Sequence, residues 1–236
     1  MLDTTGLVMS RNQRVTLALQ QHQAGNLAAA EKTYRDLLKV SPHDASVLHL
    51  LGMVLVDRGQ HEIGIDLIRR AIAADPTAAH FHSNLASILG KIGRTAEGVE
   101  HLRQAIRLDP NFPEAHNNLG VALESLGHLD DAQASFRAAF QLRPDYAEAH
   151  SHLGNVLKQT GPISEAVAAH RKAIALKPDY PEVYGNLAAA LAEMGRIDEA
   201  IAYCETIVAL RLHSPRAHSE LLFTLLNHPD YSPEAV

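Results

Sequence analysis

The sequence of 236 residues contains one cysteine, Cys204, no tryptophan and no apolar stretch as long as a membrane span. A single cysteine excludes an internal disulfide, and residues 1–10 lack the basic end and apolar core of a signal peptide. The 21 Lys and Arg against 27 Asp and Glu give a net charge of −6, so no basic surface points to nucleic acid. These absences predict a cytoplasmic protein that binds neither nucleic acid nor a membrane.

The sequence also lacks a recognisable catalytic constellation. Residues 61–65, His-Glu-Ile-Gly-Ile, begin like the helix of a zinc protease, but Ile65 stands where the second histidine is required. There is no glycine-rich phosphate loop. Histidines two apart, such as His80 and His82, point about 200° apart on a helix and cannot chelate one ion. We therefore expect no enzyme activity, no cofactor and no metal site in this chain.

One motif returns along the sequence with a fixed period of 34. Residues 114–120 read Glu-Ala-His-Asn-Asn-Leu-Gly, and close copies occupy residues 148–154 and 182–188. A fixed period of this length indicates a solenoid, in which each unit buries its apolar face against its neighbours. We expect a flexible lead-in over 1–10, six units at 11–44, 45–78, 79–112, 113–146, 147–180 and 181–214, and a partial seventh unit over 215–236. Because residues 232–234, Ser-Pro-Glu, begin a helix that the sequence does not complete, we expect the seventh unit to be truncated.

Two rows of residues predict the architecture of a unit. Glycine recurs at the turn between two helices, where a left-handed residue ends the first helix: Gly25, Gly59, Gly93, Gly127, Gly161 and Gly195. Proline recurs after the second helix and ends it: Pro42, Pro76, Pro110, Pro144 and Pro178. Small residues in the first helices allow close packing of the pair: Gly52, Ala86, Gly120, Gly154 and Ala188.

This pattern of Leu-Gly, Leu, Gly, Ala, an aromatic residue, Ala and Pro resembles the tetratricopeptide repeat over residues 11–228. The resemblance implies an all-α fold, a right-handed superhelix (α-solenoid) of antiparallel helix pairs whose first helices line a concave groove. Residues 114–120, 131–132 and 136–139 also resemble the arrays that precede the bacterial O-linked N-acetylglucosamine transferases, and the arrays of Spindly-like proteins. Residues 221–234 resemble the join between such an array and its transferase region.

Three sets of residues remain polar or small on the first helices and are candidates for the groove. An amide ladder comprises Asn84, Asn118 and Asn186, with His152 in the gap. The transferase resemblance implies that its asparagines grip an extended chain, since an amide pairs with the backbone of any peptide. The alternative is that asparagine merely tolerates an exposed helical site.

The second set is acidic: Glu114, Glu148 and Glu182. If it is functional, it favours basic partner segments, but the helix dipole alone also favours carboxylates in a first turn. The third set is small and includes Asn117 and Ser151, which would leave room for the backbone of a partner. Asn155 is paired with Ser151 rather than with lysine, which argues against a carboxylate clamp.

These features predict a scaffold that binds an extended, basic segment of a partner protein in its groove. The alternative is a different class of function, in which the chain is the substrate-recognition arm of an O-linked glycosyltransferase whose catalytic domain is absent from it. We also expect self-association through the apolar face of the last helix, which carries Leu221, Leu222, Leu225 and Leu226.

Overall fold

The computed structural model describes residues 9–210, and these residues form helices and no strands. The helices are α1 (Arg11–Gln23), α2 (Leu27–Val40), α3 (Ala45–Asp57), α4 (His61–Ala74), α5 (Ala79–Lys91), α6 (Thr95–Leu108), α7 (Pro113–Ser125), α8 (Leu129–Leu142), α9 (Ala147–Thr160), α10 (Ile163–Leu176), α11 (Pro181–Glu193) and α12 (Ile197–Leu210). The odd-numbered helices therefore begin at the equivalent position of each repeat, from Arg11 to Pro181.

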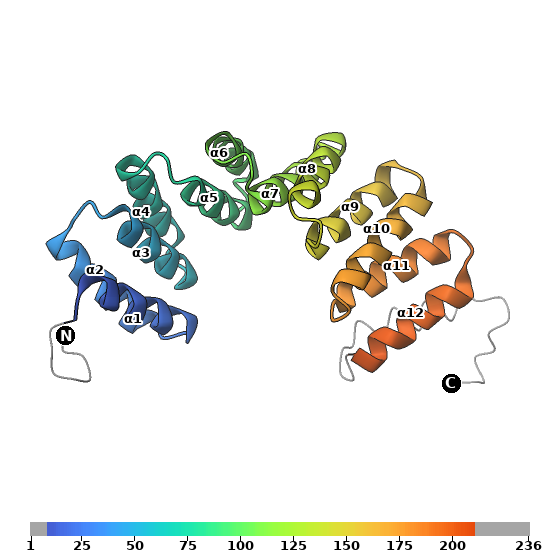
Figure 1. Cartoon of the computed structure of the whole chain (residues 1–236), viewed down its shortest axis with the longest axis horizontal. Helices are drawn as coiled ribbons and strands as arrows, with labels where there is room; N and C mark the ends of the chain where they lie inside the picture. The colour runs from blue at the N-terminus through green and yellow to red at the C-terminus, as the bar shows by residue number, and fades with distance from the viewer. Residues whose placement is uncertain (1–8, 211–236) are drawn as a thin grey trace. The chain divides into compact units, whose positions relative to one another are not determined.

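The chain divides into an N-terminal unit, residues 1–111 with α1 to α6, and a C-terminal unit, residues 112–236 with α7 to α12. Within each unit, consecutive helices run antiparallel and pack as pairs (Figure 1). In the C-terminal unit α9 contacts both α7 and α11, so the odd-numbered helices lie side by side. The predicted all-α solenoid of antiparallel helix pairs is confirmed.

Five of the glycine turns have the left-handed backbone that the sequence predicts. The φ angles are 76° at Gly25, 79° at Gly59, 83° at Gly93, 79° at Gly127 and 74° at Gly195. In each turn the residue after the glycine donates its N–H back to the helix, as His128 does to the carbonyl oxygen of Leu123 at 2.9 Å. This bond satisfies a carbonyl that the helix end would otherwise leave without a partner.

The prediction of a left-handed residue is wrong at Gly161, whose φ is −126° and ψ is −174°. The next residue, Pro162, holds the residue before it in an extended conformation and has no N–H to donate back to the helix. The helix end is closed instead by the N–H of Gly161, which donates to the carbonyl oxygen of Leu157 at 2.8 Å. As a result α9 continues to Thr160 and is 14 residues long, against 13 for α7.

This difference predicts different costs for one substitution at two glycines. Gly127→Ala should lower the free energy of unfolding by about 1–2 kcal/mol, because alanine is strained in the left-handed region. Gly161→Ala should change it by less than about 0.5 kcal/mol, because any residue adopts extended backbone and the close contact of an added Cβ is with Leu157 Cδ2, at 3.2 Å, the end of a flexible side chain. Urea denaturation of both variants measures the difference. Equal midpoints would contradict the assigned backbone at one of the two turns.

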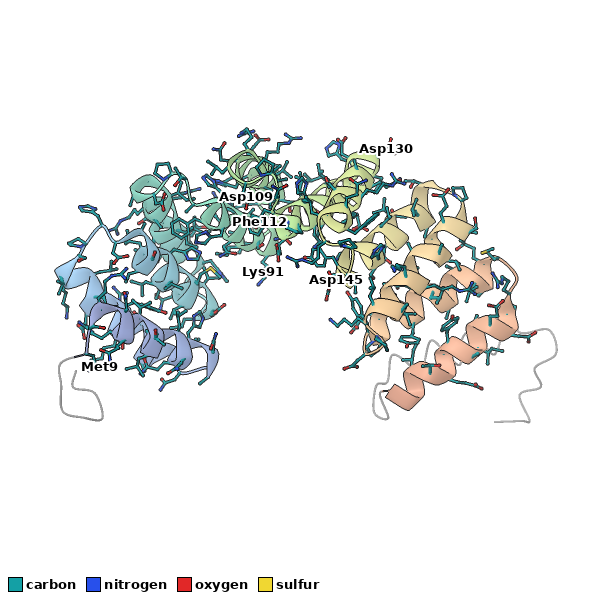
Figure 2. All side chains as sticks on the ribbon, in the orientation of Figure 1. Met9, Lys91, Asp109, Phe112, Asp130 and Asp145 are labelled. Atoms are coloured by element: carbon teal, nitrogen blue, oxygen red, sulfur yellow. The ribbon has the colours of Figure 1, made fainter. Side chains whose placement is uncertain are left out.

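The loops between pairs follow from the proline row. The residue before each proline is extended, as at Asp109 with ψ of 94° and Arg143 with ψ of 92°, so the even-numbered helices end there. Figure 2 labels Asp130 at the start of α8 and Asp145 in the loop beyond its other end. Glycine turns and proline loops thus lie at opposite ends of the helix pairs.

The small residues of the odd-numbered helices allow large side chains of the even-numbered helices to pack against the backbone. A Cβ atom at Gly120 would lie 2.5 Å from the Phe136 ring, and one at Gly154 would lie 2.5 Å from the His170 ring. Phe136 and His170 are both fully buried. The pairs α7/α8 and α9/α10 are therefore closed by a ring packed over a glycine, which fixes the spacing of the two helices.

Candidate functional site

The amide ladder lies on α5, α7, α9 and α11. Its four side chains are all partly buried, and none is fully buried. In the N-terminal unit, Asn84 Nδ2 lies 3.0 Å from His49 Nε2 on α3. Because the amide nitrogen is a donor, His49 Nε2 accepts this bond. One donor of the Asn84 amide is thus used to join α3 to α5.

In the C-terminal unit a side-chain amide pair joins α9 to α11. Asn186 Nδ2 donates to Asn155 Oδ1 at 2.9 Å, and both side chains are partly buried. An amide group has two N–H donors and two acceptor lone pairs. The bond therefore leaves the Asn155 amino group and the Asn186 carbonyl oxygen available, one donor group and one acceptor from neighbouring helices. An alignment of the repeats does not predict this hydrogen bond, because Asn155 and Asn186 do not occupy equivalent positions of the repeat.

His152, which fills the gap in the amide ladder, has an internal role. Its ring stacks on the buried Phe136 ring, with centroids 5.4 Å apart and planes 19° apart. Burial lowers the pKa of His152, and Glu148 acts in the opposite direction to a smaller extent. The imidazole is therefore held neutral near pH 7 and presents one donor and one acceptor, as an amide does.

Two members of the acidic set, Glu114 and Glu148, form ion pairs within their own helix pairs of the C-terminal unit, each with a cation at the end of the partner helix. Arg143 donates to Glu114, and Lys177 Nζ donates to Glu148 Oε1 at 2.9 Å. The bond from Lys177 lowers the pKa of Glu148, and the bond to Glu114 raises the pKa of Arg143. Glu182 lies exposed on α11.

Each of these cations also lies over a tyrosine ring of the following loop. The Arg143 Cζ atom is 4.9 Å from the centroid of Tyr146, and the Lys177 Nζ atom is 4.7 Å from that of Tyr180. A basic partner segment would have to displace an internal cation from Glu114 or Glu148. The internal ion pairs thus weigh against the prediction that these two carboxylates bind basic segments. The spacing of the glutamates in the sequence does not reveal these ion pairs.

The small set is buried, contrary to the expectation that it leaves room for a partner. Ser83 is 3% exposed, Asn117 is 6% exposed and Ser151 is 4% exposed. The Asn117 Oδ1 atom is buried and has no hydrogen-bond partner among residues 9–210. Asn117 therefore lies beneath the surface to which the neighbouring Asn118, a partly buried residue, contributes.

Within residues 9–210, no group of three or more His, Cys, Asp or Glu is arranged to hold a metal ion, and no helix is long and apolar enough to cross a membrane. Cys204 is buried, with 1% of its surface exposed. The leucines from Leu221 to Leu226, on which the expected self-association depends, lie outside the described residues.

Models of the tetratricopeptide repeat match most of the sequence. The matches cover residues 15–79, 91–127, 125–161 and 161–221. A search of curated proteins finds no match. The matched models describe the repeat in general, so the narrower resemblance to transferase arrays stays a prediction.

Solved structures share the fold. The structure is similar to that of PilF from Pseudomonas aeruginosa, with a TM-score of 0.80 and 18% identity over 92% of this chain and 97% of that one. It is similar to MamA, with a TM-score of 0.63 and 23% identity over 73% and 97% of the two chains. It is also similar to YrrB, a TPR protein with an unusual peptide-binding site, with a TM-score of 0.62 and 16% identity over 79% and 96%.

Proposed function

Because this chain belongs to the tetratricopeptide repeat family, we propose that it is a protein-interaction scaffold that binds an extended peptide segment against its odd-numbered helices and performs no catalysis of its own. Repeats of this kind expose one long layer of helices, on which a partner chain can lie across several units. The peptide-binding site named for YrrB supports this reading by analogy of fold.

The observation that carries the proposal is the amide pair of Asn155 and Asn186. Their mutual hydrogen bond orients both groups and leaves one donor group and one acceptor available. A peptide bond presents the complementary set, one carbonyl oxygen and one N–H. The pair can therefore hold the backbone of a partner without regard to its side chains, at little cost in side-chain entropy because both amides are already ordered.

The pairing of Glu114 and Glu148 bears on the chemistry of the partner. Since these two carboxylates are paired internally, we expect the amides and the neutral His152 ring to supply most of the recognition in the C-terminal unit. We infer that binding depends on backbone hydrogen bonds and depends only weakly on the charge of the peptide. A change in salt concentration should accordingly alter the affinity little.

Substitution of Asn186 tests the proposal. For a peptide selected on the wild-type protein from a display library, Asn186→Ala should weaken binding by roughly 2- to 12-fold, because each lost amide contact is worth about 0.5–1.5 kcal/mol. Isothermal titration calorimetry measures the affinities. The matched control is Gln141→Ala, which removes an exposed amide from α8, an even-numbered helix of the same unit.

The proposal requires that Gln141→Ala bind as the wild type does and that its free energy of unfolding lie within about 0.5 kcal/mol of the wild-type value. Asn186→Ala should lose about 0.5–1.5 kcal/mol of stability with its hydrogen bond to Asn155, and should remain folded during the titration. Equal affinities for wild type and Asn186→Ala, with a peptide that binds the wild type, would contradict the proposal. Equal losses for Asn186→Ala and Gln141→Ala would place the binding surface elsewhere.

A further inference from the structure

A small cavity in the N-terminal unit is lined by two arginines and two aliphatic side chains. Its volume is about 200 Å³, and its walls are Arg11 and Arg14 from α1, Leu37 and Val40 from the end of α2, and Ser41 and Asp44 from the loop to α3. Val40 is 78% exposed, the most exposed large apolar side chain among residues 9–207. The cavity thus combines a cationic wall with an apolar one.

Arg11 and Asp44 form an ion pair, so each balances the charge of the other. The Arg11 Nε atom donates to Asp44 Oδ2 at 2.7 Å, and the second Asp44 oxygen accepts the N–H of Val47 at 3.2 Å as the N-cap of α3. Among residues 9–210, Asp44 forms an ion pair with Arg11 and with no other cation.

Arg14 is the cation of the cavity that lacks a counter-charge. Its Nε atom is buried and has no hydrogen-bond partner, and its guanidinium forms no ion pair within residues 9–210. A buried donor without a partner costs about 1–3 kcal/mol, and more when the group is charged. The nearby Asp36 is hydrogen bonded to Lys39 at 2.7 Å and interacts with Arg14 only at longer range, without an ion pair between them.

We propose that this cavity is a binding site for an aliphatic carboxylate. The guanidinium of Arg14 offers donors in a planar fork that matches a carboxylate, and the ion pair of Arg11 and Asp44 leaves one positive charge in excess. Leu37 and Val40 offer an apolar wall for a chain of a few carbons. The same chemistry occurs in a free short-chain acid and in the C-terminal residue of a peptide.

Nuclear magnetic resonance titration of the full chain with sodium butyrate tests the site, with sodium chloride at equal ionic strength as the reference. Butyrate should shift the backbone amide signals of Arg14, Val40 and Ser41 along a saturating curve, and n-butanol should bind at least about tenfold more weakly. Arg14→Gln should weaken butyrate binding by about tenfold or more. Arg70→Gln, which removes an exposed arginine from α4 of the same unit, should leave it unchanged.

Two further ligands distinguish a free acid from a peptide C-terminus as the source of the carboxylate. They are acetyl-Gly-Val with a free C-terminus and the same dipeptide with an amidated C-terminus. Tighter binding of the free peptide acid than of butyrate assigns the site to a peptide C-terminus, and the reverse assigns it to a free acid. If Arg14→Gln lowers the melting temperature, Arg14→Lys serves instead, since lysine keeps the charge but loses the planar fork, and butyrate binding should still weaken. Equal binding of butyrate by wild type and both Arg14 variants, or equal binding of butyrate and n-butanol, overturns the proposal.

Discussion

Lowering the pH from 7 to 4 should remove about 3 kcal/mol from the free energy of unfolding for each of two buried histidines, His49 in the N-terminal unit and His170 in the C-terminal unit. Burial lowers the pKa of both from 6.5 to about 4, with smaller contributions from His80 and Lys158 respectively. His170 is fully buried and His49 is 6% exposed, so solvent screens neither effect appreciably.

The direction follows from proton uptake. Between pH 6.5 and 4 the unfolded chain binds a proton at each histidine that the folded chain excludes, so stability falls as the pH falls through this window. Above pH 6.5 neither state binds the proton, and below pH 4 both do, so the contribution is constant on either side. The summed loss is comparable to the total stability of an ordinary domain, about 5–15 kcal/mol, and acid unfolding is the expected outcome.

The variant His170→Phe isolates one of these contributions. Both ring nitrogens of His170 are buried without a hydrogen-bond partner among residues 9–210, and the equivalent residue in α8 is Phe136. Replacement by phenylalanine should raise stability at pH 7 by about 1–3 kcal/mol and should remove about 3 kcal/mol of the loss between pH 6.5 and 4.

Urea denaturation at pH 7, 5.5 and 4 measures the change, with the exposed His43 replaced in the control variant His43→Gln. A pH dependence that is the same in wild type and His170→Phe would show that His170 takes up its proton in the folded chain. It would contradict the buried, neutral ring.

Gly120→Ala and Gly90→Ala should change stability in opposite directions. A Cβ atom at Gly120 would lie 2.5–2.8 Å from three carbons of the Phe136 ring, and forced overpacking of this kind costs about 1–3 kcal/mol. At Gly90, also helical, a Cβ atom would have nothing within 4 Å. There alanine should stabilise by about 0.8–1.0 kcal/mol, because it has the higher helix propensity.

The double variant Gly120→Ala, Phe136→Leu identifies the cause of the loss at Gly120. In α5 and α6 the equivalent positions hold Ala86 and Leu102, so the smaller partner accompanies the larger helix residue. Leucine at 136 should therefore recover part of the stability lost by Gly120→Ala, as thermal or urea denaturation of the three variants would measure. A double variant whose losses merely add would mean that the Phe136 ring and residue 120 do not interact.

Much of the fold can be predicted from two rows of residues, because each acts through local backbone geometry. Glycine ends the odd-numbered helices, proline ends the even-numbered helices from α2 to α10, and these helices end where the two rows require, with one exception. The exception at Gly161 also has a local cause, the proline that follows it, and the dipeptide Gly161-Pro162 was a readable signal.

The candidate site could be predicted only as a set of helix positions. The repeat period aligns equivalent residues, whereas contacts between neighbouring helices join residues that are not equivalent. Asn155 meets Asn186 at an offset of 31, and Glu148 meets Lys177 at an offset of 29. These offsets depend on the tilt of adjacent helices and on the path of the loops, which the repeat alone does not specify.

The same limit explains Asn117. Its neighbour Asn118 follows it by one residue, a rotation of about 100° around the helix, which is enough to move a side chain from the surface to the contact with an adjacent helix. Residue type does not distinguish the two environments, because Asn118 of the amide ladder and Asn117 of the small set are both asparagine. The exposed fraction does distinguish them, since Asn117 is 6% exposed and counts as buried, whereas Asn118 is only partly buried.

The side-chain amide resonances of Asn155 and Asn186 report whether a bound peptide contacts the amide pair. Heteronuclear correlation spectra of the ¹⁵N-labelled full chain would be recorded during titration with a peptide selected on the wild type, after assignment through Asn155→Ala and Asn186→Ala. Both NH₂ signals should shift along the binding curve, because a peptide held by the amide pair places its backbone against both side chains. A peptide that saturates the protein while both signals remain unchanged, and that shifts amides of the even-numbered helices instead, would contradict this prediction.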